Sequence, residues 1–279
     1  MLGTLSIIGG VGFMLLRGLI DKLNKNSPLP SSVQDQLQQA DTLINRGQLN
    51  DALTIYRRIE NTIDKETHSF VYGCLKSLIG ENYFRQAKNS DAIDNYHLAI
   101  QSFRIAESIF DNDEHREFYL INQANLVYTG LALSQLAQRE ELLHAAFHDL
   151  QKALPHITTH NETTAFVRFQ LLLGDVSCSL AKFNDRAINC SIAIESYKTA
   201  LKYFSQKDHP LDYAMTQNNL GAAYITLAEI EDQQDNCLLA IEAYKNTLSV
   251  IKQDEHPDSF MRVQANLIEA EKMLAEAGK

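Results

Sequence analysis

The sequence has few helix-breaking residues and carries no excess of positive charge. Its 279 residues include 12 Gly and 5 Pro, and so low a breaker count favours helix nearly throughout the chain. With 45% hydrophobic and 22% charged residues, the composition excludes wholesale disorder, collagen and a polytopic membrane protein. The length fits one or two globular domains or a single elongated repeat array.

Basic residues and paired cysteines are both scarce. The 25 Lys and Arg face 35 Asp and Glu, a net charge of −10, and a surface this acidic repels phosphate backbones, so we expect no nucleic-acid partner. The four cysteines contain no Cys-x-x-Cys pair and fit a reducing compartment, where thiols act as small core hydrophobes. They are Cys74, Cys178, Cys190 and Cys237.

Motifs for phosphate binding and for covalent catalysis are missing. The sequence contains no G-x-G-x-x-G, no G-x-x-x-x-G-K-[ST] and no G-x-S-x-G, so we predict no enzyme and no cofactor. Two histidine pairs have the i, i+4 spacing that can hold zinc, but neither has the Glu of H-E-x-x-H, so we predict no metal site. An enzyme with a metal site on these histidines stays as an alternative; they are His144, His148, His156 and His160.

A repeat of 47 residues organises the body of the chain. Five segments align without a gap. Each begins with a small residue, has a bulky residue four positions later and has another core residue three positions after that. This i, i+4, i+7 spacing marks one face of a helix. The five segments begin at Ala52, Ala99, Ala146, Ala193 and Ala240. A second helical pattern with the same period precedes each segment, and its alternation of bulky and small residues suits two antiparallel helices that pack closely.

The repeat predicts five helix pairs and a last single helix that caps the array. Pro210 and Pro257 are placed where a helix begins, as their missing N–H prefers. The predicted pairs are 33–46 with 49–64, 69–88 with 91–110, 116–137 with 140–157, 163–182 with 185–205, and 210–231 with 235–252, and the last helix is 258–277.

These segments resemble the tetratricopeptide repeat. The resemblance is carried by LGAAY at 220–224 and AIEAYKNT at 240–247, which match that family's pattern of Leu-Gly, an aromatic, then Ala with an aromatic four residues on. It covers residues 33–277, and the long period is similar to that of bacterial and archaeal members and of kinesin light chains. The resemblance implies an all-α, right-handed α-solenoid of antiparallel helix pairs, a fold that by itself does not determine function.

In that family the first helix of each pair lines a concave groove that binds a peptide. The resemblance implies that Asn125, Asn219 and Asn266 hydrogen-bond the backbone of an extended peptide, because an amide both donates and accepts; in the alternative, these side chains bond within the array. The other expected groove residues are Cys74, Phe84, Ile121, Tyr128, Leu131, Arg168, Cys178, Met215, Asn218, Ile225 and Arg262.

The groove lacks the cations with which some family members clamp a terminal carboxylate. Three of the positions that would carry those cations read Glu81, Asp175 and Glu269, and none of the others is Lys or Arg. An apolar groove edged by carboxylates suits an amphipathic helix or a peptide with basic flanks.

The N-terminal residues form an apolar segment that is separate from the repeats. Leu2 to Leu16 carries no charge, so we predict an apolar helix at 1–23 that anchors the protein in a membrane, followed by a linker at 24–32. Arg17, Lys22 and Lys25 lie on its C-terminal side and would keep the repeats in the cytosol. The expected anchor residues are Leu5, Ile7, Ile8, Val11, Phe13, Met14, Leu15 and Leu16.

The sequence thus predicts a membrane-tethered, cytosol-facing scaffold that recruits another protein and performs no chemistry. The alternative is a soluble adaptor or regulatory subunit whose N-terminal helix docks into a partner. Homo-oligomerisation is a further possibility, because solenoid faces and glycine-rich helices both favour it.

Overall fold

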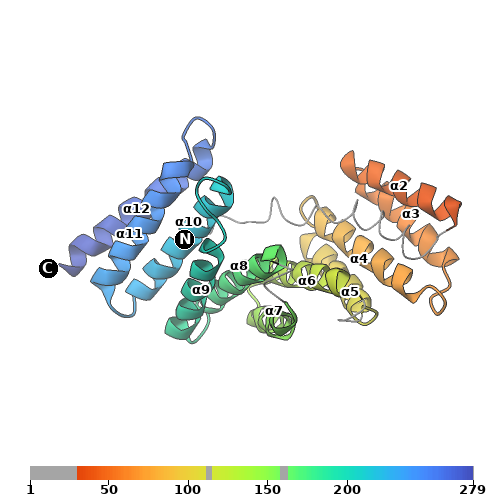
Figure 1. Cartoon of the computed structure of the whole chain (residues 1–279), viewed down its shortest axis with the longest axis horizontal. Helices are drawn as coiled ribbons and strands as arrows, with labels where there is room; N and C mark the ends of the chain where they lie inside the picture. Colours follow the sequence, from red (N-terminus) through yellow and green to blue (C-terminus); the bar gives the residue numbers. More distant parts are fainter. Residues whose placement is uncertain (1–29, 111–114, 158–162, 279) are drawn as a thin grey trace. The chain divides into compact units, whose positions relative to one another are not determined.

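The computed structural model describes residues 30–110, 115–157 and 163–278 (Figure 1). This part of the chain forms eleven α-helices and one short 3-10 helix and contains no strand, which confirms the expected all-α class. The predicted apolar helix 1–23 lies outside the described residues, as do residues 24–29 of the predicted linker.

The observed helices match the predicted ones in number and order. Their starts agree within two residues, whereas several end two to four residues earlier than expected because the chain leaves the helix through a tight turn. After α4, for example, the N–H of Asn89 donates to the carbonyl of Gln86 at 2.8 Å. The helices are α2 (Ser31–Asn45), α3 (Leu49–Thr62), α4 (Ser69–Gln86), α5 (Ala92–Glu107), α6 (Arg116–Ala137), α7 (Glu140–Ala153), η2 (Leu154–His156), α8 (Thr163–Leu180), α9 (Arg186–Leu201), α10 (Pro210–Ala228), α11 (Gln233–Val250) and α12 (Pro257–Ala277).

The described residues belong to two compact units. The N-terminal unit, residues 30–156, contains α2 to α7 and η2, and the C-terminal unit, residues 157–278, contains α8 to α12. Within each unit every helix packs against the next one, as in a solenoid. In addition, α4 contacts α6, and α10 contacts both α8 and α12. The first helices α4 and α6 therefore lie beside one another in the N-terminal unit, as do α8, α10 and α12 in the C-terminal unit.

An aromatic ring over a glycine joins the two helices of three pairs. A Cβ atom built on any of these glycines would come closer than 3.0 Å to the ring, so only glycine allows the two helices to pack this closely. The pairs are Gly80 with Phe103, Gly174 with Tyr197, and Gly221 with Tyr244. In the α6–α7 pair the same two positions hold Val127 and Leu150, both fully buried, so a branched residue faces an aliphatic one there.

The turn between the two helices of a pair contains a residue in the left-handed conformation. These residues are 47 apart and have φ of 45° at Asp91, 52° at Gln138, 41° at Asp185 and 46° at Asp232. In three of the four turns an asparagine four residues later donates from Nδ2 to the carbonyl oxygen just before the turn. These bonds are Asn95 to Ser90 (2.9 Å), Asn189 to Asn184 (3.0 Å) and Asn236 to Glu231 (2.9 Å). Leu142 takes the asparagine position in the remaining turn.

Candidate protein-binding face

The first helices of the C-terminal unit carry eight of the fourteen predicted groove residues. On α8 and α10, Arg168, Cys178 and Met215 are partly exposed, whereas Ile225 is buried. The three asparagines expected on this face are largely inaccessible, with exposed fractions of 0% for Asn218, 1% for Asn219 and 7% for Asn266. The predicted contact of Asn219 and Asn266 with a peptide backbone stays a prediction.

The amide of Asn219 has a partner within the unit. Its Nδ2 donates to Oδ1 of Asp175 on α8 at 3.1 Å, and its own Oδ1 accepts from Nδ2 of Asn218 at 3.3 Å. The hydroxyl of Tyr197 on α9 donates to the same Oδ1 at 2.7 Å. Because Gly174 has no side chain, the Tyr197 ring can cross α8 and bring its hydroxyl to Asp175. Three helices thus converge on one carboxylate.

The environment of Asp175 shifts the pKa values of the groups around it. Burial raises the pKa of Asp175 to about 6, although the hydrogen bonds from Tyr197 and Asn219 act in the opposite direction. Burial also raises the pKa of Cys178 to about 12, and that of Tyr197 well above its ordinary value. Asp175 is therefore the group of this cluster that changes charge near neutral pH. In the sequence, Asp175 stands out only because it occupies a position where some members of the resembled family carry a cation.

The first helices of the N-terminal unit carry the remaining groove residues. Ile121, Asn125 and Tyr128 on α6 are partly exposed, whereas Leu131 is 4% exposed. Phe84 on α4 packs against the Tyr96 ring, with 5.5 Å between ring centroids, and belongs to the core between α4, α5 and α6. The structure therefore brings Ile121, Asn125 and Tyr128 together on one face of α6, and it places Phe84 and Leu131 in contact with the core.

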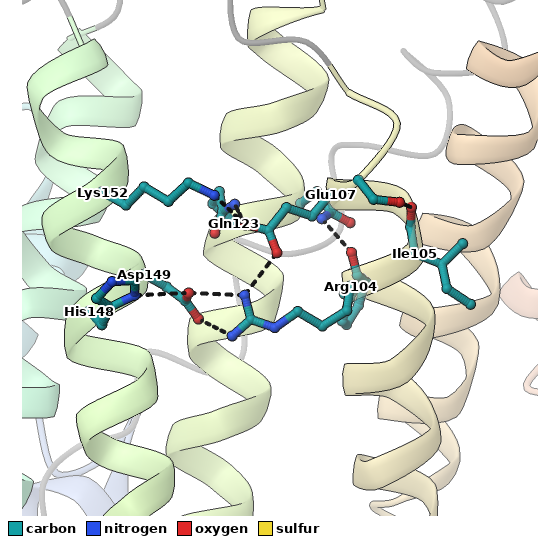
Figure 2. Close-up of polar contacts among 10 residues, drawn as sticks. Arg104, Ile105, Glu107, Gln123, His148, Asp149 and Lys152 are labelled. Atoms are coloured by element: carbon teal, nitrogen blue, oxygen red, sulfur yellow. Dashed lines mark hydrogen bonds and ion pairs between the residues drawn. The ribbon is translucent and has the colours of Figure 1, made fainter.

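A charged cluster that the repeat pattern does not predict joins α5, α6 and α7 (Figure 2). Arg104 donates to both carboxylate oxygens of Asp149, at 3.0 and 2.7 Å, and to Glu107 at 2.8 Å. Glu107 also accepts from Gln123 at 2.8 Å and from Lys152 at 2.9 Å. Arg104 and Asp149 lie 45 residues apart in the sequence, and so do Glu107 and Lys152. This separation is two residues shorter than the repeat, so the repeat does not predict either contact.

The hydrogen bonds of the charged cluster outweigh the cost of burial for Glu107. Burial alone would raise its pKa, but donors from Arg104, Lys152 and Gln123 lower the pKa to about 2. Burial raises the pKa of Asp149 despite the opposing effect of Arg104. A surface depression of about 430 Å³ lies over this cluster. The two carboxylates of Glu107 and Asp149 balance the two cations Arg104 and Lys152, so the cluster has no surplus charge that could bind a ligand. Its contacts hold α5, α6 and α7 together.

Of the two histidine pairs noted in the sequence, only His144 and His148 lie wholly among the described residues, on α7. His144 contacts Glu140 at 3.0 Å, and Nδ1 of His148 lies 3.9 Å from Asp149. No group of three His, Cys, Asp or Glu side chains with a metal-binding arrangement occurs among the described residues, which do not include His160.

The membrane prediction falls on residues that the structure does not describe. Within 30–110, 115–157 and 163–278, no helix has both the length and the apolar character that a bilayer span requires. The predicted anchor at 1–23 is not among these residues.

Comparison with protein-family models finds no match for this chain, and comparison with curated proteins finds no significant similarity. The resemblance to the tetratricopeptide repeat therefore depends on the residues of this chain alone and stays a prediction.

Proposed function

We propose that this protein is a non-enzymatic interaction scaffold whose first helices bind a peptide or an amphipathic helix of another protein. In this proposal the helix pairs form a right-handed α-solenoid of the tetratricopeptide type. The observation that carries it is the contact between the first helices of successive pairs, α4 with α6 and α10 with α8 and α12. Neighbouring helices with accessible side chains give an extended partner a continuous surface.

The chemistry of these helices indicates the kind of partner. Ile121, Tyr128 and Met215 are half-buried and offer apolar and aromatic surface, as the anchors of protein interfaces do. Residues 157–279 contain 11 Lys and Arg against 17 Asp and Glu. An acidic surface attracts a partner with basic groups, so we propose a peptide or helix with apolar anchors and basic flanks.

Selection of binding peptides tests this function directly. A library of random twelve-residue peptides is displayed and selected on the full chain in detergent micelles, and affinities of the enriched peptides are then measured. We expect peptides that lose about tenfold or more in affinity for Met215→Ala, since removal of an interface anchor costs more than about 1 kcal/mol. The matched control is Leu238→Ala on α11, a second helix, where the side chain is 49% exposed. Equal binding to both variants, or no enriched peptide, would contradict the proposal.

The second part of the proposal is a tether at residues 1–23, with the repeats in the cytosol. Its support is the uncharged stretch from Leu2 to Leu16, followed by three basic residues. The full chain and a version lacking residues 2–20 are compared by alkaline-carbonate extraction and flotation. We expect the full chain to resist carbonate and the shortened chain to be soluble. If the full chain and the shortened chain are both soluble, the prediction of a membrane anchor is wrong. The apolar segment then becomes a candidate for docking into a partner protein.

A further inference from the structure

The carboxylate of Asp175 is held in one orientation by its neighbours. Both of its donors, the hydroxyl of Tyr197 and Nδ2 of Asn219, bond to Oδ1, and Asn218 in turn positions Asn219. Oδ2 accepts no hydrogen bond from any described residue. These three partners are at most 1% exposed, whereas Asp175 is partly exposed. Asp175 is therefore the one partly exposed residue among these four polar partners.

The two acidic side chains that are buried among the described residues each pair with a cation. Glu81 pairs with Arg85 at 2.6 Å and Asp149 with Arg104 at 2.7 Å, and both acids are less than 10% exposed. Asp175 makes no ion pair with any described residue, although its charge is partly desolvated. A carboxylate that is fixed by donors, partly desolvated and unpaired is a site that a cation of a partner can complete.

We infer that Asp175 is a subsite for a cationic side chain, the ammonium of a lysine or the guanidinium of an arginine in the bound peptide. This inference rests on the proposed function, because it places one residue of the partner on the face formed by α8 and α10. The acidic surplus of the C-terminal unit favours the same kind of ligand. Cys178, one turn further along α8, is partly exposed and neutral, so it provides an apolar neighbour for the alkyl part of such a side chain.

The subsite makes binding depend on pH. The groups that face Asp175 are Cys178 on α8, Tyr197 on α9 and Asn219 on α10, and the pKa values of the first two are raised so far that they stay neutral. Asp175 has a pKa of about 6 without a ligand, and a bound cation lowers that pKa. Binding therefore releases a proton at pH 5, and affinity should increase about tenfold between pH 5 and pH 7.5.

The test uses Asp175→Asn in the full chain. Asparagine keeps an oxygen that can accept from Tyr197 and Asn219, but it has no charge. Random twelve-residue peptides are selected at pH 7.5 on the wild type, on this variant and on Glu242→Gln, which removes an exposed charge from α11. We expect peptides enriched in Lys or Arg from the wild type and from the control, and loss of this enrichment for Asp175→Asn.

A double-mutant cycle then identifies the contact. The probe is a selected peptide and its copy with the basic residue replaced by the neutral norleucine. We expect Asp175→Asn and the norleucine peptide each to lower affinity by about tenfold to a hundredfold, and the combination to lower it no further, since the two changes remove one charge-assisted contact. The rise in affinity with pH should disappear in the variant.

The possible failures separate the subsite from the proposed function. Selected peptides without a basic residue, or additive losses in the cycle, would overturn the subsite while peptide binding itself stands. The absence of any enriched peptide on all three proteins would overturn both.

Discussion

Three glycines of the first helices pack directly under an aromatic ring of the next helix, and the tightest of these contacts is that of Gly174 with Tyr197. We expect Gly174→Ala to destabilise the C-terminal unit by about 1–3 kcal/mol, because the new methyl group would overlap the ring and force the two helices apart. The gain in helix propensity from alanine is smaller than this cost. Urea unfolding followed by circular dichroism measures the difference.

Gly130 provides the matched control for this substitution. It also lies within a first helix, α6, but a Cβ atom there would meet its nearest neighbours at 3.6 Å, an ordinary contact. Gly130→Ala should therefore stabilise the protein by about 0.5–1 kcal/mol, as expected for a helical glycine with free space. If both substitutions stabilised the chain, the close packing of Gly174 under Tyr197 would be wrong.

Tyr197 and Tyr244 occupy the same repeat position but differ in what their hydroxyl groups contact. The Tyr197 hydroxyl donates to Asp175, whereas the Tyr244 hydroxyl is buried and has no hydrogen-bond partner among the described residues. We expect Tyr197→Phe to cost about 1.5–3 kcal/mol, the range for a hydrogen bond to a charged group, and Tyr244→Phe to be neutral or stabilising. The midpoints and slopes of urea unfolding curves check both. Equal costs would show that the Asp175 contact adds no stability.

At the scale of the elements, the turn between α6 and α7 departs from the other three. Its left-handed residue is Gln138, with φ of 52°, where the other turns have Asp. Asp and Asn tolerate this conformation better than Gln does. We expect Gln138→Gly to stabilise the N-terminal unit by about 1 kcal/mol, because glycine adopts the left-handed region without strain.

The control for the turn is the same substitution inside a helix. Gln101 is exposed in the middle of α5, and Gln101→Gly should destabilise the unit by about 1 kcal/mol. Thermal unfolding of both variants beside the wild type gives the comparison. A loss of stability in Gln138→Gly would mean that the Gln138 side chain stabilises the unit by more than the left-handed backbone at this residue destabilises it.

The helices were predictable because their signal recurs. The 47-residue period fixed the identity of each helix, and Pro210 and Pro257 were confirmed at the first turns of α10 and α12. The left-handed turns were missed, although Asp followed by Asn four residues later recurs at 91, 185 and 232. That pattern is a local turn signal and could have been found in the sequence.

The charged cluster and the Asp175 site were not predictable in the same way. Arg104 meets Asp149 and Asn219 meets Asp175 at separations of 45 and 44 residues, so neither pair follows the period. Which polar side chains meet across helices depends on how each helix is rotated about its axis. A repeat in the sequence gives the order of the helices but leaves that rotation open.

At the scale of the whole molecule, each unit contains a carboxyl group with a shifted pKa, and the two pKa values are shifted in opposite directions. Glu107 in the N-terminal unit has a pKa of about 2, and Asp175 in the C-terminal unit has a pKa of about 6. A carboxylate with a lowered pKa stabilises its unit above the unfolded pKa of about 4, and this stability is lost as pH falls towards 2. A carboxyl with a raised pKa stabilises its unit below about 4, and this stability is lost as pH rises through 6.

Two substitutions of the same kind should therefore have opposite effects at pH 7. Glu107→Gln should destabilise the N-terminal unit by up to about 3 kcal/mol, and the difference from wild type should vanish near pH 2. Asp175→Asn should stabilise the C-terminal unit by up to about 3 kcal/mol, and this difference should vanish below pH 4, where the wild-type carboxyl is protonated. The gain also means that loss of peptide binding in Asp175→Asn cannot be attributed to unfolding.

The native cysteines allow each unit to be followed separately. Cys74 is fully buried in α4 of the N-terminal unit, and Cys190 and Cys237 are fully buried in α9 and α11 of the C-terminal unit. Labelling with a thiol reagent that reacts at acid pH, in urea titrations read by mass spectrometry, reports the opening of each unit. Each variant is compared with the wild type at the same pH, so the reactivity of the reagent cancels. If Asp175→Asn changed the labelling of Cys74 as much as that of Cys190, the two units would unfold together. Glu107 and Asp175 would then both affect the free energy of a single unfolding transition.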